Sequence, residues 1–446
     1  MKKNCLFIHA QETDKVTFFS SISNFLKEEE IKTTHLTFSR LDKKVYKQLG
    51  ITNTRFLPKI LKDFPPHLNE VNANKYDLDK LLYFTLKFND LNGFTYNKEE
   101  LYKNASRYIN YLNELYSQEA FDLIVIWNDT FMYDSIAKQF ASENGINTLI
   151  FEDGIFRPNT ITIDPKGVNY GNSVPQDPQY YRQLNLEKIV DETKSEIYQI
   201  EKPTNIKKFY IYERILDSFH TWLIKDQLNL NIIFETIPHK LSRVVKKIVN
   251  KKNKTKDIKL PEEYIFVPFQ VHDDSQVILN SPQIENMEEL VKVINHELKL
   301  YNKLFNKQLV AVFKEHPADY GRVDYSDIYN LYKKERHLLF LKEGDTKKIV
   351  ENCTLVITIN STVGIEALQS YKPVITLGNA YYNIKGVCNY CSNHRDLHNN
   401  INSVSIDKDL VDRFLNYLRY IYQIDGNWRK GQFNYSKFRK KLESLR

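Results

Sequence analysis

Cysteine is scarce in this sequence, because the chain of 446 residues has four. They are Cys5, Cys353, Cys388 and Cys391. So small a number excludes a disulfide-stapled secreted domain and is typical of a reducing compartment. Cys388 and Cys391 form a CxxC with His394 close by, but no second CxxC supplies further ligands. We therefore expect ordinary thiols and no metal site.

Long apolar segments are also missing. The longest runs, such as residues 123–127 and 355–359, have the length of strands, whereas a helix that crosses a bilayer needs about 20 apolar residues. The apolar stretch after the basic start, residues 1–4, is too short for a signal peptide. These observations predict a soluble protein in the cytoplasm.

The net charge of +7 is unevenly distributed. Basic residues gather between positions 240 and 259, among apolar pairs that recur at a helical period. A solvated helix end is the ordinary explanation, and contact with an anionic membrane is the alternative, with about 1 kcal/mol from each basic residue. The residues assigned to this membrane-facing patch are Lys246, Lys247, Lys251, Lys252 and Lys254. Nucleic-acid binding is not expected, because the patch lacks aromatic stacking positions.

Strand-like and helix-like segments alternate in two parts of the chain, residues 1–176 and 261–405. Bare apolar runs that alternate with helices predict βαβ units and parallel sheets. Residues 177–260 are predicted to be a helical insertion with a basic linker, and residues 406–446 to be helices that pack back toward the first domain. Residues 154–175 are expected to form a long polar loop. The pattern predicts an α/β protein of the GT-B type, with two Rossmann-like doubly wound domains.

The strongest group of polar residues follows a strand that is expected to end at Asn360. Ser361 and Thr362 would then present hydroxyl and N–H groups at a helix N-terminus, which suits an anion. Plain N-capping by Ser361 is the alternative. Gly364 is expected to allow close approach to the strand or to a ligand, and Glu366 to accept hydrogen bonds from ribose hydroxyls.

His316 and Pro317 follow another predicted strand, which ends at Lys314. Ligands of parallel sheets bind beyond the carboxyl ends of the strands, so we expect His316 and Ser361 to face one crevice. His316 would donate to a phosphate oxygen and Lys314 would add positive charge. A purely structural turn histidine is the alternative.

Acidic residues follow two further strands. Asp273 and Asp274 leave the first strand of the second domain, and their neighbours Gln270, His272 and Gln276 favour a polar site over a surface turn. A carboxylate there would be a base, a nucleophile or a ligand contact.

Glu152 and Arg157 end a strand of the first domain and are expected to face the same cleft from its opposite wall. Two such carboxylates suit chemistry at a glycosidic centre. Asn128, also at a strand end, would line the acceptor side.

Taken together, these motifs resemble those of capsular polysaccharide biosynthesis proteins that act as β-Kdo transferases. The matching segments, in family order, are residues 151–158, 162–169, 270–276, 316–317, 360–368, 372–374 and 377–378. They cover both α/β parts and leave out residues 177–256.

The resemblance implies a GT-B fold, a CMP-Kdo donor, retention of configuration, and no metal or other cofactor. It implies that Asp274, with Asp273 as the alternative, is the nucleophile and Glu152 the acid/base. The implied donor contacts are Lys314, His316, Pro317, Ser361, Thr362 and Glu366. Other possible substrate contacts are Asn128, Arg157, Gln270, Asp273, Gln276 and Asn360.

The chain has one pair of α/β parts, so it resembles the single-module members of that family. This implies a phosphatidylglycerol-type lipid acceptor, a peripheral place on the cytoplasmic side of the inner membrane, and a capsule assembly complex as partner. Two alternatives remain open: a transferase with another nucleotide-activated donor, and a non-catalytic scaffold at the membrane surface.

Overall fold

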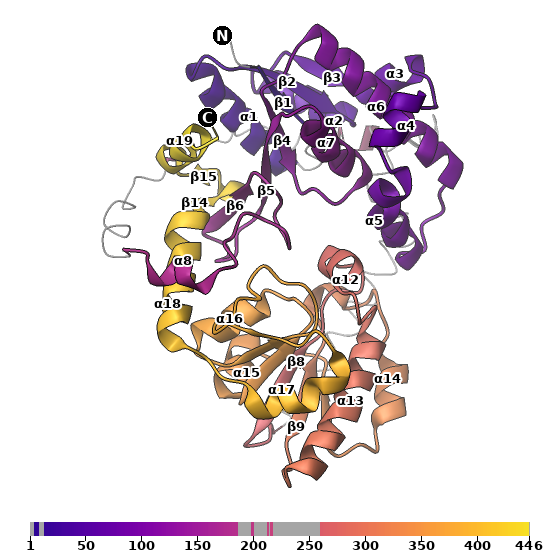
Figure 1. Ribbon diagram of the computed structural model, residues 1–446. Helices are drawn as coiled ribbons and strands as arrows, with labels where there is room; N and C mark the ends of the chain where they lie inside the picture. The colour runs from indigo at the N-terminus through magenta and orange to yellow at the C-terminus, as the bar shows by residue number, and fades with distance from the viewer. Residues whose placement is uncertain are drawn as a thin grey trace. The chain divides into compact units, whose positions relative to one another are not determined.

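The computed structural model describes residues 4–8, 13–185, 198–199, 212–213, 215–216 and 259–445 (Figure 1). These residues form two compact units. Unit 1 takes in the described residues of Met1–Ser173, Glu187–Phe234 and Arg419–Arg446, and unit 2 those of Val174–Leu186 and Glu235–Leu418. The predicted membrane-facing lysines, Lys246 to Lys254, and most of the predicted helical insertion lie outside the described residues.

Unit 1 contains a sheet whose described strands run in the order β3-β2-β1-β4-β5-β6-β14-β15-β7. The strands are β1 (Asn4–Phe7), β2 (Lys32–Thr37), β3 (Thr54–Phe56), β4 (Leu123–Trp127), β5 (Asn147–Asp153), β6 (Thr160–Asp164), β7 (Tyr198–Gln199), β14 (Ile424–Asn427) and β15 (Gln432–Phe433). β1 to β5 are parallel, whereas β6, β14, β15 and β7 pair antiparallel.

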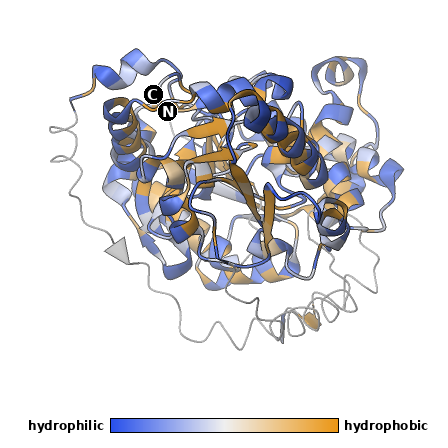
Figure 2. Ribbon diagram, turned by 90° about the horizontal axis from the view of Figure 1, so that it is seen from below, coloured by the Kyte–Doolittle hydropathy of each residue, from blue (hydrophilic) through white to orange (hydrophobic). Residues whose placement is uncertain are grey.

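Both faces of the unit 1 sheet are covered, as the bare apolar strands predict. Leu6 and Ile124 belong to the core on one face, and Phe7 and Val125 to the core on the other, because neighbouring strand residues point to opposite sides. In Figure 2 the strands are mostly orange, whereas the helices alternate between blue and orange. The helices of unit 1 are α1 (Thr13–Glu28), α2 (Arg40–Gln48), α3 (Leu57–Ile60), η1 (Leu61–Asp63), α4 (Glu70–Lys75), α5 (Leu78–Leu91), α6 (Lys98–Gln118), α7 (Met132–Glu143), η6 (Trp428–Lys430) and α19 (Tyr435–Glu443).

The expectation that residues 154–175 form one long loop is wrong, because β6 lies within them. β6 pairs antiparallel with β5, with Phe151 opposite Ile163 and Asp153 opposite Ile161. Threonine and isoleucine alternate along β6, and all five of its residues are buried. β-branched residues suit such a pleated surface, although the prolines and glycines around them point to a loop.

The expectation of a wholly helical C-terminal tail is also only partly correct. α18 (Lys408–Asn416) is followed by a π-helical turn, η5 (Tyr417–Tyr422), and α19 is present. Between them, however, β14 and β15 form an antiparallel hairpin, whose turn ends at Gly431 with a φ of 69°. Figure 1 shows these yellow strands next to β6, with which β14 pairs. The tail is thus shared, since α18 belongs to unit 2 and residues from Arg419 on belong to unit 1.

Unit 2 contains a parallel sheet, whose described strands run in the order β10-β9-β8-β11-β12-β13. They are β8 (Tyr264–Pro268), β9 (Val310–Lys314), β10 (Leu338–Leu341), β11 (Leu355–Thr358), β12 (Val374–Thr376) and β13 (Asn389–Tyr390). Its helices are α8 (Pro178–Arg182), α12 (Ser275–Asn280), α13 (Met287–Leu304), η3 (Pro317–Asp319), α14 (Ser326–Tyr332), α15 (Thr346–Asn352), α16 (Val363–Gln369), η4 (His394–Asp396), α17 (Leu397–Ser403) and α18.

The chain runs outward from β8 to β9 and β10, then returns to the other side of β8 with β11, so the strand order reverses between β8 and β11. Such a reversal opens a crevice beyond the carboxyl ends of the two strands. The predicted fold class, α/β with two Rossmann-like doubly wound units as in GT-B proteins, is confirmed. Among the described helices, none has the length and apolar character needed to cross a membrane.

Gly154 is the position in the β5–β6 hairpin that tolerates a side chain least. Its N–H donates to the Thr160 carbonyl at 3.1 Å, and a Cβ atom there would overlap that same carbonyl. We expect Gly154→Ala to lower the free energy of unfolding by about 3 kcal/mol, measured by denaturant titration.

Gly167→Ala is the matched control. A Cβ at Gly167 would meet only the flexible side-chain ends of Asp129 and Lys138, at 3.1 and 3.2 Å, so we expect a loss below about 1 kcal/mol. Equal losses in the two variants would contradict the close approach of backbone at Gly154.

Candidate functional site

Two loops meet at the switch point of unit 2, one after β8 and one after β11, and two amide side chains join them. The Gln270 side chain accepts from the Asn360 backbone N–H at 3.1 Å and donates to the Asn360 side-chain oxygen at 3.0 Å. The Asn360 side-chain nitrogen in turn donates to the Gln276 carbonyl at 2.9 Å. Gln270 and Asn360 are both buried. The structure therefore brings the predicted site residues Gln270, Asn360 and Gln276 together, and the side chains of Gln270 and Asn360 link the two loops.

Asp274 is held by this linked loop. One of its carboxylate oxygens accepts the Gln276 backbone N–H at 2.9 Å, as the N-cap of α12, and the other lies 3.4 Å from the Gln270 side-chain nitrogen. Burial raises the pKa of the Asp274 carboxyl above the ordinary aspartate value, and the nearby Asp273 adds to the rise. The hydrogen bonds from Gln276 and Gln270 and the proximity of His316 oppose it.

Asp273 has a different environment, although it is the next residue. Its carboxylate forms an ion pair with Arg322, and both side chains are largely buried. A buried carboxylate held by a guanidinium is fixed in position. Of the two neighbouring acids, Asp273 is thus ion-paired with Arg322, whereas Asp274 is not held by that arginine.

A second link joins the β8 loop to the loop after β9. The carboxylate of Asp319, which is fully buried, accepts from the His272 backbone N–H at 3.1 Å and lies 2.8 Å from its Nδ1. The Tyr325 hydroxyl donates to the same carboxylate at 2.8 Å. Sequence reasoning missed Asp319 and Arg322, whose roles depend on partners that lie about 50 residues earlier in the chain.

His316 and Pro317 lie where the sequence predicts them, directly after β9. Nδ1 of His316 accepts the Ala318 backbone N–H at 3.1 Å and caps the short helix η3. A neutral imidazole that accepts at Nδ1 carries its proton at Nε2. His316 is half-buried and Pro317 is exposed.

Ser361 and Thr362 occupy the turn between β11 and α16. The strand ends at Thr358, two residues before the expected end, and the helix begins at Val363. The Ser361 hydroxyl accepts from the Val363 N–H at 3.2 Å, which is the local capping that we considered as the alternative. Thr362 is exposed.

Gly364 was expected to allow close approach to the strand or to a ligand, but the group that approaches it is a tyrosine side chain. The Tyr382 hydroxyl donates to the Ser361 carbonyl at 2.5 Å, and a Cβ atom on Gly364 would lie 2.5 Å from that hydroxyl. Tyr382 thereby fixes the turn that carries Ser361.

Lys314 and Glu366 are close enough to influence each other. Burial lowers the pKa of Lys314, and the carboxylate of Glu366 is the strongest influence that opposes the shift. The lysine stem lies against Gly344, with two of its carbon atoms 3.9 Å from the position of a Cβ there. Glu366 itself is exposed at the first turn of α16.

Glu152 lies near the end of β5 in unit 1. One of its carboxylate oxygens accepts from the Asn128 side chain at 2.7 Å, and the other from the Asp153 backbone N–H at 2.9 Å. Burial raises the pKa of Glu152 above the ordinary glutamate value. Asn128 has a φ of 63°, and its side-chain oxygen accepts from the Thr130 N–H and hydroxyl at 2.9 and 2.6 Å. The structure therefore brings Asn128 to Glu152 as a donor.

Arg157 is exposed, and its Nε donates to the Gly154 carbonyl at 3.3 Å. The neighbour of Glu152, Asp153, is held instead by the C-terminal hairpin: the Trp428 indole donates to it at 2.6 Å, and Arg429 donates at 3.1 and 3.3 Å. Burial works to raise the pKa of Asp153, but these two donors lower it further than burial raises it.

The cysteines are buried free thiols. Burial raises the pKa of Cys388 to about 12 and that of Cys391 to about 11. Since the thiolate is the reactive form, neither thiol is activated for chemistry at neutral pH.

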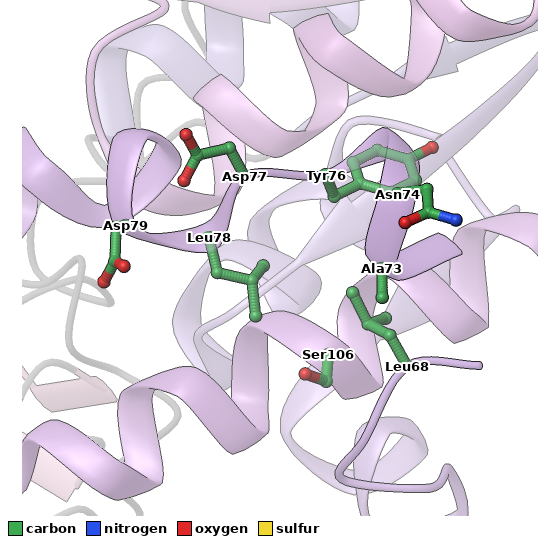
Figure 3. Close-up of a pocket in the computed structure, with 8 residues that line it drawn as sticks. All are labelled: Leu68, Ala73, Asn74, Tyr76, Asp77, Leu78, Asp79 and Ser106. Carbon is green, nitrogen blue, oxygen red and sulfur yellow. The ribbon is translucent and has the colours of Figure 1, made fainter. Parts of the chain in front are cut away.

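Figure 3 shows a pocket of about 520 Å³ in unit 1, and none of the predicted site residues lines it. It is lined by Leu68, Ala73, Asn74, Tyr76, Asp77, Leu78, Asp79 and Ser106. Asp77 caps α5 and Asp79 accepts from the Tyr102 hydroxyl, so both acids have structural partners.

The chain matches a family model described as capsule polysaccharide biosynthesis protein over residues 122–428. Among curated proteins, it is 28% identical to the capsule polysaccharide export protein KpsS of Escherichia coli over 302 residues, which cover 64% of this chain and 74% of that protein. It is 26% identical over 357 residues to the capsule polysaccharide modification protein LipB of Neisseria meningitidis, with 73% and 79% covered.

Solved structures give weaker similarities. The β-Kdo 2,7 transferase KpsC of Thermosulfurimonas dismutans matches with a TM-score of 0.36 and 16% identity, over 81% of this chain and 96% of that one. A UDP-GlcNAc 2-epimerase of Methanocaldococcus jannaschii matches with a TM-score of 0.31 and 13% identity, over 94% and 99%.

The Gln270 side chain offers a test of the switch-point link. We expect Gln270→Ala to lower the free energy of unfolding by about 1–3 kcal/mol, because it leaves the buried Asn360 N–H without its acceptor. It also removes a donor that lowers the pKa of Asp274, so that pKa should rise further, as measured by NMR titration of labelled aspartate carboxyls.

Gln276→Ala is the control, since it keeps the backbone N–H that donates to the Asp274 cap of α12 and removes only a side chain. An Asp274 titration that is identical in Gln270→Ala and the unaltered protein would contradict the link.

Proposed function

The chain belongs to the capsule polysaccharide biosynthesis protein family, and on that premise we propose that it is a retaining glycosyltransferase that moves β-Kdo from CMP-Kdo to a phosphatidylglycerol-type lipid. The resemblance of the sequence motifs to this family is therefore confirmed. The relatives in Escherichia coli and Neisseria meningitidis are named for capsule export and modification, which supports a role in capsule assembly. The donor, the acceptor and the stereochemistry rest on the motif resemblance and on the chemistry of the residues.

The observation that carries the proposal is the environment of Asp274. It lies at the switch point of a doubly wound sheet, where such sheets bind ligands. Its pKa is raised by burial, and it is fixed by Gln276 and Gln270. Perturbed carboxyls in such positions are characteristic of functional sites.

The neighbouring acid is less suited to attack a sugar. A nucleophilic carboxylate must offer an oxygen lone pair to the anomeric carbon, and the ion pair with Arg322 engages the Asp273 carboxylate. This contrast supports Asp274 as the nucleophile and a structural role for Asp273.

In the proposed reaction, a carboxylate oxygen of Asp274 bonds to the anomeric carbon while the bond from that carbon to the CMP phosphate breaks. CMP leaves with the bonding electrons. The acceptor hydroxyl then attacks the same carbon, its proton passes to Glu152, and the Asp274 carboxylate is released. Two successive inversions retain the configuration.

Both carboxylates must be ionised for these steps. A raised pKa makes each of them a stronger base once it has lost its proton, so burial favours both attack by Asp274 and proton capture by Glu152. Asn128, which donates to Glu152, would hold the carboxylate in the orientation needed for proton transfer.

The donor phosphate is assigned to the loops after β9 and β11. The Nε2–H group of His316 suits a phosphate oxygen, and the exposed hydroxyl of Thr362 and the side chain of Ser361 lie on the neighbouring loop. CMP carries a single phosphate, so the proposal needs no metal ion. Glu366 is assigned to the ribose, and Lys314 balances its charge; Arg157 is then the candidate for the carboxylate of Kdo.

Replacement of Asp274 tests the mechanism. We expect Asp274→Asn to lower kcat by roughly 10³-fold or more, measured as CMP release from CMP-Kdo with phosphatidylglycerol. Because the folded-state pKa of Asp274 lies above its unfolded value of about 3.8, ionisation costs stability as the pH rises through that window. Asparagine removes this cost and can still cap α12, so stability at neutral pH should be unchanged or higher.

Asp273→Asn is the matched variant at the adjacent position. It weakens the ion pair with Arg322, so it should lose stability and keep part of its turnover. Robust turnover by a folded Asp274→Asn variant would refute the assignment of the nucleophile.

The nucleotide is tested by thermal shift with CMP, UDP, GDP and CDP. A ligand at 100-fold its Kd stabilises the folded protein by about 2.7 kcal/mol, and we expect CMP to give the largest shift. A larger shift with another nucleotide would favour a different donor. No shift with any of the four would favour the non-catalytic scaffold.

A further inference from the structure

A second pocket of unit 1, far richer in positive charge, lies at the β3 edge of the sheet. It has a volume of about 630 Å³ and is lined by Arg40, Lys43, Lys44, Lys47, Ile51, Thr52, Thr54, Phe56, Pro58, Lys59 and Lys62. Among these lining residues six are basic and none is acidic. We call it the basic groove.

Four of the cations come from one face of α2. Arg40, Lys43, Lys44 and Lys47 recur at the helical spacing i, i+3, i+4 and i+7 and are all exposed. The opposite face is buried through Leu41, Asp42, Val45 and Tyr46. The exposed residues of α2 are thus these four cations and the uncharged Gln48.

This arrangement works against the stability of α2. Like charges at i and i+4 repel, and Arg40 in the first turn opposes the helix dipole, which Asp42 in the same turn favours. A solvated surface helix gains more from alternating signs. On the same edge, the neighbouring basic residues Lys32 and Arg55 share the carboxylate of Glu119, at 3.7 and 3.0 Å. Inside the groove, Lys44 has the carboxylate of Glu213 as its partner.

Three apolar residues, Ile51, Phe56 and Pro58, also line the groove, and Phe56 is partly exposed. Lys59 and Lys62, in α3 and η1, line it as well, and both are exposed. Cations beside apolar side chains suit a partner that has anionic groups next to apolar ones, and interfacial membrane binding combines those two contributions. A soluble polyanion would use the cations and leave the apolar residues without a counterpart.

We propose that the basic groove is a docking surface for a membrane that contains acidic phospholipids. The residues of the groove are different from those of the lysine patch predicted at 246–254. The proposal concerns how the protein binds a membrane and not which sugar it transfers. Vesicle binding therefore tests it without a sugar donor and without a measurement of turnover. Basic residues over the short edge strand β3 also hinder edge-to-edge pairing, and that explanation alone predicts no lipid dependence.

The test is flotation of the full chain with vesicles of phosphatidylcholine alone or with 30% phosphatidylglycerol. Each basic residue at an anionic surface changes the partition coefficient by about fivefold. We therefore expect the triple variant Lys43→Gln, Lys47→Gln, Lys62→Gln to bind the acidic vesicles roughly 100-fold more weakly. The variant leaves Lys44 and its partner Glu213 intact, so the unfolding midpoint should not fall.

The matched control carries Lys303→Gln, Lys307→Gln and Lys333→Gln, three exposed lysines of unit 2 with the same change of charge. It should bind like the unaltered protein. A second comparison, with Lys246→Gln, Lys247→Gln and Lys251→Gln, separates the groove from the predicted lysine patch.

Three results would overturn the proposal. The groove variant binds acidic vesicles as well as the control does; or the unaltered protein binds both vesicle types equally; or it binds a soluble polyanion such as dextran sulfate through the groove while it ignores the vesicles.

Discussion

The hydrogen bonds between Gln270 and Asn360 are the constraint on which the arrangement of unit 2 depends. They join the loops after β8 and β11, and the contacts of Asp319 with His272 join the first loop to the one after β9. Three strand ends are thereby fixed by a few buried polar side chains. Such a network specifies one geometry when all its members are satisfied and is costly when any one is lost.

Adjacent acids with contrasting environments recur in the two units. Asp273 is held by Arg322 and Asp153 by Trp428 and Arg429, whereas burial raises the pKa of the neighbouring Asp274 and Glu152. In each motif one acid anchors the loop through its partners, and burial disfavours the charged form of the other. Pairs of carboxyls whose environments differ in this way are how enzymes divide structural and chemical roles.

Local patterns predict the parallel parts of the fold well. The apolar run at residues 123–127 matches β4 residue for residue, and the run at 355–359 matches β11 to within one residue, because a buried parallel strand is a bare apolar run. β6 is hidden by the prolines and glycines around it, whereas the place of β14 in the sheet escapes prediction because its pairing with β6 is non-local: Ile424 lies opposite Ile161. The same reason hides Arg322 and Asp319, whereas the strand-end positions of Asp274, His316 and Glu152 follow from the pattern itself.

The place of β14 and β15 in unit 1 has a consequence for the order in which a ribosome releases the chain. Residues 259–418 of unit 2 are synthesised before Ile424. β6, which ends at Asp164, pairs with the strand that contains Ile424 and therefore lacks this neighbour during that time. Until then the edge of β6 offers open backbone groups to other chains. Unit 1 is thus the last to finish folding. The nascent chain is most exposed to association with other chains while the residues of unit 2 are being synthesised.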